Sequence, residues 1–181
     1  MINCALKPMT AKRLENLFQY AKEDADWPRS LMTSADRQVA LEQCQAYQML
    51  GYGGMYAVEQ HREVIGMATL EIVTSPLPEM NNVVVFEGGT HLLPDVRGQG
   101  INQQVKHALE NFAEHEFRAS YLIFTIEESN QRAIAAFNKL SPPYGAVHSR
   151  SVKTELFFPL CKYRSYQRQS PCIIFHRALQ P

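Results

Sequence analysis

The apolar positions near the start of the chain recur at helical spacing. Four of them define one face of a predicted helix: Leu14, Leu17, Phe18 and Ala21. Thr10 stands where the N-cap of this helix is expected, and a short strand at 3–6 precedes it. A second helix is predicted from Ser34, a candidate cap, to about Leu50, where the glycine-rich segment 51–54 ends it. The chain therefore begins with the order βαα.

The middle of the chain changes to β-rich runs. Residues 55–60 and 64–73 lie on either side of the polar turn 61–63, a pattern typical of an antiparallel hairpin. Another strand is predicted from Val83 to about Leu93. The glycine pair at 88–89 inside this strand indicates either a bulge or a close approach of the backbone to another group.

Helical spacing returns after residue 100. Five apolar residues lie on one face of a predicted amphipathic helix: Ile101, Val105, Ala108, Leu109 and Phe112. A strand at 121–126 and a helix from Asn130 to Leu140 follow, and two more strands are predicted at 152–158 and 173–176. The full order is βααβββαβαββ, which predicts a single α/β domain over residues 1–181.

Composition narrows the classes of function. Lysine plus arginine equals aspartate plus glutamate at 18 each, so no net field attracts the chain to nucleic acid. Residues 162–168 mix cations with aromatics, as RNA-binding loops do, but in a neutral chain we favour a solvated loop. No apolar run reaches the roughly 18 residues that span a bilayer, and the start 1–8 is too short for a signal peptide. We therefore expect a cytoplasmic protein with no nucleic-acid partner and no membrane partner.

The cysteines and histidines do not predict a metal site. The four cysteines are scattered without a CxxC pair, and we expect reduced thiols: Cys4, Cys44, Cys161 and Cys172. His107 and His115 lie eight positions apart on one helix, too far for adjacent metal ligands. We expect no metal.

The turn 97–100, with the sequence Arg-Gly-Gln-Gly, carries the sharpest chemical signal. It joins a predicted strand to a predicted helix whose first amide groups have no internal partners. With the helix dipole these amides form an anion site, and the glycines let a pyrophosphate approach the backbone. A Rossmann fingerprint would need a third glycine at Gln103, and a P-loop would need Gly-Lys-Ser/Thr. Plain turn geometry is the alternative for this segment taken alone.

Read together, these segments resemble the GNAT acyltransferases. Residues 95–100 match the family turn Gln/Arg-x-x-Gly-x-Gly/Ala at both glycines, with Asp95 at the first position. Residues 122–140 look like the family's later strand, its Asn-x-x-Ala-Ile segment and its helix. The hairpin 56–73 resembles the stretch before the cofactor strand. The resemblance implies a single mixed, mostly antiparallel sheet flanked by helices, and acetyl-CoA as the acyl donor.

The resemblance also implies where coenzyme A would bind. In the family the fourth and fifth strands part, and the pantetheine arm lies between them. Backbone amides at 97–102 would hold the pyrophosphate, backbone at 92–93 would hold the arm and the thioester, and Asn130 would lie beside the arm. The expected cofactor residues are Leu92, Leu93, Arg97, Gly98, Gln99, Gly100, Ile101, Asn102, Asn130 and Phe137.

The catalytic groups are less clearly marked. Direct attack of an amine on a thioester needs a base for the ammonium and uses an acid for the departing thiolate. The usual tyrosine acid of the family is replaced by Phe137, so Tyr144 is a candidate substitute. Some relatives place a glutamate base where this chain has Thr125. Glu87 and His91 remain as candidate bases on one strand face if no bulge intervenes, with proton removal through water as a further option.

The sequence therefore predicts an N-acetyltransferase that moves an acetyl group from acetyl-CoA to a primary amine on a small molecule or a peptide. Residues 100–106 faintly resemble relatives that acetylate protein N-termini, and the resemblance makes a homodimer possible. Two alternatives stay open. One is a non-catalytic acyl-CoA-binding module, motivated by Phe137 and Thr125, and the other is a transferase that uses a longer acyl-CoA.

Overall fold

The computed structural model describes residues 4–28, 31–73, 77–149, 152–153, 167–168 and 171–180. Four helices lie in these ranges: α1 (Ala11–Ala21), α2 (Ser34–Met49), α3 (Ile101–Phe117) and α4 (Gln131–Asn138). The main sheet contains β1 (Cys4–Pro8), β2 (Gly53–Gln60), β3 (Glu63–Ile72), β4 (Val85–Leu92), β5 (Tyr121–Glu127), β6 (Gly145–Ser149) and β9 (Cys172–Ala178). A separate pair consists of β7 (Val152–Lys153) and β8 (Gln167–Arg168).

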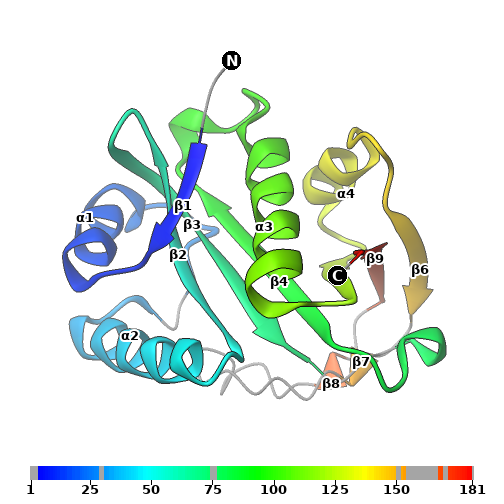
Figure 1. Cartoon of the computed structure of the whole chain (residues 1–181). Helices are drawn as coiled ribbons and strands as arrows, with labels where there is room; N and C mark the ends of the chain where they lie inside the picture. Colours follow the sequence, from blue (N-terminus) through cyan, green and yellow to red (C-terminus); the bar gives the residue numbers. More distant parts are fainter. Residues whose placement is uncertain are drawn as a thin grey trace.

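The main sheet has the strand order β1-β2-β3-β4-β5-β9-β6 (Figure 1). Every neighbouring pair is antiparallel except β4 and β5, which are parallel. The predicted α/β fold, with one mixed and mostly antiparallel sheet flanked by helices, is confirmed. The predicted hairpin is β2 and β3, and its turn residues His61 and Arg62 both have positive φ.

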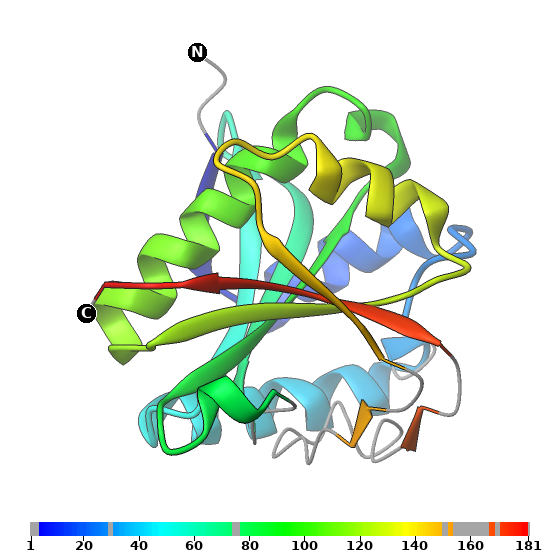
Figure 2. The same cartoon turned by 90° about the vertical axis from the view of Figure 1, so that its right-hand side faces the viewer.

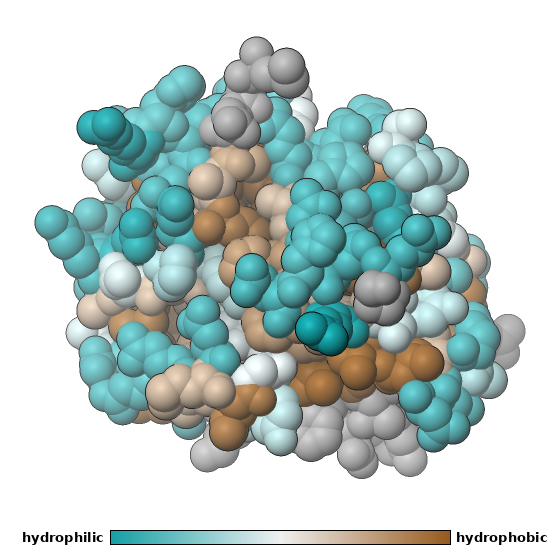
Figure 3. Space-filling model, in the orientation of Figure 1, coloured by the Kyte–Doolittle hydropathy of each residue, from teal (hydrophilic) through white to brown (hydrophobic). Residues whose placement is uncertain are grey.

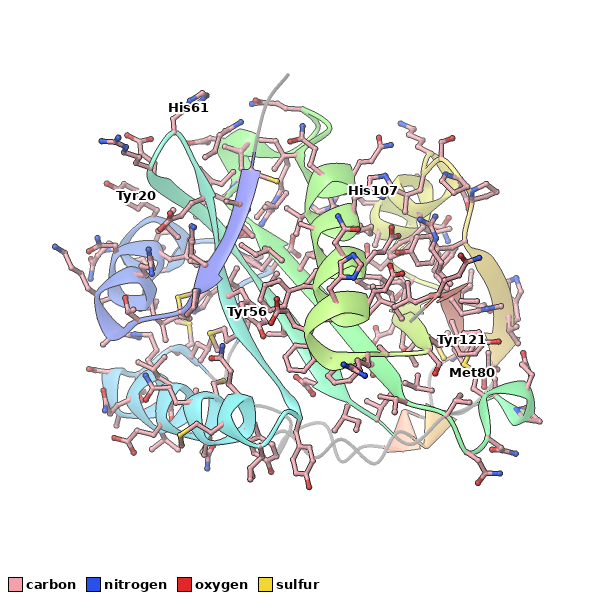
Figure 4. The ribbon with its side chains drawn as sticks, viewed as in Figure 1. Tyr20, Tyr56, His61, Met80, His107 and Tyr121 are labelled. Atoms are coloured by element: carbon pink, nitrogen blue, oxygen red, sulfur yellow. The ribbon has the colours of Figure 1, made fainter. Side chains whose placement is uncertain are left out.

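Helices cover both faces of the sheet, α1 and α2 on one side and α3 and α4 on the other (Figures 1 and 2). Successive side chains of β2 point to opposite faces of the sheet, so this strand contributes to the cores on both sides. Tyr56 points toward α3, where its ring centroid lies 4.8 Å from that of Phe112 (Figure 4). Its neighbours Met55 and Ala57 join the core beneath α1 and α2. The outward side of α3 is hydrophilic, as its amphipathic pattern predicts (Figure 3).

The helix starts follow local capping chemistry. The Thr10 hydroxyl accepts a hydrogen bond of 3.3 Å from the Arg13 N–H, which confirms the predicted cap of α1. The cap of α2 is Thr33, one residue before the predicted Ser34, and its hydroxyl accepts from the Asp36 N–H at 3.1 Å. Threonine and serine are both good caps, so the sequence alone did not choose between them.

The glycine pair in β4 marks a close approach and not a bulge. The register between β3 and β4 runs without a shift from Ile72 to Gly66. A Cβ atom on Gly88 would lie 2.5 Å from Cε1 of Phe124 on β5, and one on Gly89 would lie 2.5 Å from Oγ1 of Thr69 on β3. Side chains at these positions would force the strands apart. The regular register also keeps Glu87 and His91 on one strand face.

The end of the chain differs most from the sequence prediction. The strand β6 pairs with β9 although the sequence did not predict it. Its five residues alternate only weakly between exposed and half-buried, so its strand conformation depends on pairing and not on a local pattern. The predicted strand at 173–176 is the centre of β9. Most of the predicted strand at 152–158 and of the segment 162–168 lies outside the described residues.

Candidate active site

The glycine turn adopts a backbone that opens the first amides of α3. Gly98 and Gly100 have φ values of +78° and +76°, in the left-handed region that glycine adopts without strain. Gly100 is the N-cap of α3, and no side chain caps this helix start. The Gln99 side chain closes the turn by donating to the Asp95 carbonyl at 2.8 Å. An uncapped helix start leaves amide donors and the positive end of the dipole available to an anion.

The strands β4 and β5 part next to this turn. Their pairing is limited to Val85–Glu87 against Tyr121–Ile123. Beyond that point β4 stays paired with β3 as far as Leu92, and β5 stays paired with β9 as far as Glu127. Figure 2 shows the two strands running in clearly different directions. This is the strand separation that the family resemblance implied.

Aromatic rings fill the point where the strands part. Phe124 packs under Gly88, and its ring centroid lies 5.0 Å from that of Phe137 on α4. Phe137 stacks on Phe175 of β9 with centroids 4.4 Å apart, and the Tyr144 ring meets it edge-on at 5.4 Å. Phe137, expected beside the cofactor, is therefore a buried part of this aromatic cluster.

The Arg97 side chain holds the turn against the loop that follows α1. Its Nε donates to the Leu92 carbonyl at 2.8 Å, and its Nη atoms pair with the carboxylates of Asp24 and Asp26. Asp26 also pairs with Arg132 at the start of α4. The guanidinium is engaged within the protein, and the Arg97 N–H donates to the Pro94 carbonyl at 3.1 Å, so the structure favours the amides after Arg97 as the phosphate donors.

The backbone expected to hold the pantetheine arm is partly engaged as well. The Leu92 carbonyl accepts from Arg97, and the Leu93 N–H donates to the Ile65 carbonyl at 2.9 Å. Asn130 caps α4, because its Oδ1 accepts from the Ala133 N–H at 3.0 Å. These contacts fix the positions of the expected residues. They leave the part of β4 that faces away from β3 for the arm.

His91 is buried beside the loop that follows α1. It is 8% exposed, its Nε2 lies 3.3 Å from Asp24 Oδ2 without hydrogen-bond alignment, and its ring meets Trp27 edge-on at 5.2 Å. Burial lowers the His91 pKa, helped by Arg97 and by Arg132 and opposed by the nearby aspartates. We expect a neutral imidazole at pH 7.

The His91 pKa predicts how stability depends on pH. Because the folded-state pKa lies below the unfolded value near 6.5, the unfolded chain binds more protons as the pH falls below that value. The contribution of His91 to stability is present above the unfolded pKa and is lost as the pH falls through the folded pKa. Each pH unit within that window costs up to about 1.4 kcal/mol. His91→Gln should melt with a weaker pH dependence than the wild type between pH 7 and 5, measured by circular dichroism. Parallel curves would contradict this.

Asp24 titrates in a lower pH range than His91, so it does not affect the His91 melting comparison between pH 7 and 5. Burial opposes its ionisation, but hydrogen bonds from the Asp26 N–H at 3.1 Å and from Arg97 outweigh burial and lower the Asp24 pKa. The stability that Asp24 contributes is therefore lost only below its unfolded value near 3.8.

Glu87 lies where the two strands part. It is half-buried, faces Glu71 of β3 in the register and is paired with Ile123 of β5. His91 follows four residues later on the same face, about 13 Å away along the strand. The two predicted bases therefore cannot serve one reaction point together. Thr125, at the alternative family position, lies on β5 two residues beyond Ile123.

Two charged residues of α3 escaped the sequence analysis. Lys106 is 2% exposed, and burial lowers its pKa to about 8. Glu110, one turn later, accepts a hydrogen bond from the Tyr144 hydroxyl and pairs with Arg177 Nη1 at 2.6 Å. Lys106 lies against rings from β5 and α4, and Glu110 pairs with Tyr144 and with Arg177 of β9. A lysine in an amphipathic helix is normally assigned to solvent, so only the width of the apolar face could have flagged it.

The Tyr144 hydroxyl is not placed to act as a general acid. Burial raises its pKa, and its hydrogen bond to the Glu110 carboxylate raises it further. The candidate substitute for the family tyrosine therefore sits beside Phe137 with its hydroxyl already engaged.

Among the described residues, no helix is both long and apolar enough to span a bilayer. Those residues also contain no cluster of three or more metal-ligating side chains.

The sequence matches a known protein family over most of its length. The model described as an acetyltransferase (GNAT) domain matches residues 4–141, most of the chain. The chain belongs to the GNAT acetyltransferase family. No curated protein matches the sequence.

The GNAT fold is shared with solved structures over nearly the whole chain. An acetyl transferase from Salmonella typhimurium, described as modifying the N-terminal serine of ribosomal protein L7/L12, aligns with a TM-score of 0.71 and 15% identity, covering 98% of this chain and 95% of that one. AAC(6')-Ib in complex with paromomycin and acetyl-CoA gives 0.70 and 17%, covering 97% and 93%. A spermidine N-acetyltransferase chimera from Vibrio cholerae gives 0.65 and 14%, covering 97% and 95%. At these identities the likeness shows the fold.

Proposed function

We propose that this GNAT protein transfers an acetyl group from acetyl-CoA to a primary amine. The observation that carries the proposal is the separation of β4 and β5 directly beside the turn that opens α3. Open space at that turn supports a pyrophosphate site, because an added Cβ at Gly98 or at Gly100 would meet no atom within 4 Å outside the adjacent residues. The uncapped amides at the start of α3 supply the donors.

We assign cofactor binding and proton removal to different parts of the site. Amides at 98–102 bind the pyrophosphate, and the backbone of β4 beyond Glu87 positions the arm and the thioester carbonyl, where charge collects in the transition state. Glu87 lies on the opposite face from Phe86 and Gly88, toward α1 and α2. We propose that it removes the proton from the acceptor ammonium there, with His91 as the alternative base.

Calorimetric titration with acetyl-CoA tests binding, and release of the CoA thiol tests turnover. Because solved relatives are described as acting on a protein N-terminal serine, on spermidine or on an aminoglycoside, the acceptor panel contains a serine peptide, spermidine and paromomycin. Binding together with amine-dependent thiol release is the expected result. Longer acyl-CoAs in the same titration test the donor. Failure of the wild type to bind any acyl-CoA would refute the proposal.

A non-catalytic acyl-CoA-binding module is the second candidate. The observation in its favour is Phe137, which offers no proton where family members carry a tyrosine and which is buried among other rings. Tight binding without thiol release for any amine would support it. The predicted cytoplasmic location and the possible homodimer stay predictions.

A further inference from the structure

Lys106 is a buried cation without an anionic partner. Among the residues that the structure describes, its Nζ makes no hydrogen bond and no ion pair. Its neighbours are two ring faces, Phe137 with the centroid 4.3 Å away and Phe124 with the centroid 5.8 Å away. A cation–π contact offsets only part of the cost of burying an ammonium. Methionine or leucine would fill this position without that cost, so the charge points to a ligand.

The position of the ammonium identifies the part of the ligand. Phe124 lies directly under Gly88, where β4 and β5 part. Phe137 lies on α4, where the family resemblance implies a tyrosine. Lys106 reaches both rings from the second turn of α3, the helix whose start carries the glycine turn. The ammonium therefore lies at the inner end of the path that begins at the pyrophosphate turn and follows β4.

We propose that Lys106 is the general acid of the transfer and donates a proton to the sulfur of coenzyme A. The proposal rests on the proposed function. The acceptor nitrogen forms its bond to the acetyl carbon, the carbon–sulfur bond breaks, and its electron pair goes to sulfur. Sulfur takes a proton from Nζ. The acceptor nitrogen loses one proton before the attack and a second as the amide forms; both leave through the base to solvent, and Lys106 recovers one from solvent.

The proton affinities suit this step. Burial lowers the Lys106 pKa to about 8, close to the value near 8.5 of an ordinary thiol, so the transfer is nearly balanced at neutral pH. The other titratable groups around this side chain are engaged with one another. Glu110 of α3 holds Tyr144, His107 and Arg177 of β9, and from α4 the ring of Phe137 lies against the ammonium.

The ionisation of bound coenzyme A tests the proposal without any acceptor. The ultraviolet absorbance of the thiolate is followed against pH for coenzyme A bound to the wild type, to Lys106→Met and to Lys106→Arg, with desulfo-coenzyme A as the blank. An ammonium near the sulfur favours the thiolate. We expect its midpoint in the wild type and in Lys106→Arg to lie about one pH unit or more below that in Lys106→Met. Identical midpoints in all three proteins would overturn the proposal.

Turnover separates proton donation from charge. Lys106→Met should lose kcat by about 10²-fold or more, and Lys106→Arg should lose nearly as much, because a guanidinium keeps its proton. Acetyl-CoA affinity should stay close to wild type, and Lys106→Met should melt at or above the wild-type temperature, because it removes a buried charge. The decline of wild-type kcat above pH 8 should be absent in Lys106→Met. Phe137→Tyr, added to Lys106→Met, should restore part of the lost kcat by returning a phenol to the family position.

The outcomes distinguish two failures. A wild type that releases thiol while both Lys106 variants stay within about threefold of its kcat would remove the acid assignment and leave the acetyltransferase proposal intact. A wild type that binds no acyl-CoA would remove both.

Discussion

Replacing Gly98 or Gly100 by glutamate is expected to weaken acetyl-CoA binding by about 100-fold or more, equivalent to about 2.7 kcal/mol. The reason is electrostatic. At both positions an added Cβ meets no atom within 4 Å, so the side chain fits sterically, but it places a carboxylate at the helix start where the pyrophosphate would bind. Isothermal titration calorimetry of each variant with acetyl-CoA measures the loss.

Gly51 offers a matched control for the backbone strain. It lies in the turn between α2 and β2 with a φ of +74°, and an added Cβ there also meets nothing within 4 Å. Gly51→Glu therefore carries the same left-handed strain of about 1–2 kcal/mol, far along the chain from the anion site. All three variants should melt at similarly lowered temperatures, while only Gly98→Glu and Gly100→Glu lose binding. Equal affinities in all three would mean that the turn is plain geometry.

Sequence patterns predicted the features that depend only on interactions between residues close together in the chain. The Thr10 cap, the 55–73 hairpin and the apolar stripe of α3 each depend on residues within one element or two adjacent ones. The glycine turn was readable for the same reason. Its two glycines and the following helix form one contiguous segment, so a strand, a turn and a helix start could be predicted together.

The side-chain network around the turn was not predictable in this way. Arg97 pairs with Asp24, 73 residues earlier in the chain, and Arg132 pairs with Asp26, 106 residues earlier. No periodicity links such positions, and charged residues in a loop are assigned to solvent by default. Lys106 was missed for a related reason. The ring faces that surround it come from β5 and α4, so its burial follows from tertiary packing and not from the pattern of α3.

Replacing Glu87 by glutamine is expected to lower kcat by about 10²- to 10⁴-fold, the usual contribution of a positioned base, with acetyl-CoA affinity unchanged. Glu87 lies where β4 and β5 part, on the opposite strand face from Gly88 and its aromatic contact. A base there would act on the acceptor from the α1 and α2 side while Lys106 acts on the sulfur from the α3 and α4 side. Steady-state kinetics with the amine that the acceptor screen identifies measures the change.

Glu71 and His91 make that test specific. Glu71 faces Glu87 across the β3–β4 register, so Glu71→Gln removes a neighbouring charge without removing the proposed base. We expect Glu71→Gln to raise KM for a cationic amine and to keep kcat, because a second carboxylate attracts the acceptor but takes no proton from it. His91→Gln should also keep kcat, since its imidazole lies about 13 Å along the strand from Glu87. If His91→Gln loses kcat and Glu87→Gln does not, the base is His91, and the thioester lies nearer the glycine turn than the point where the strands part.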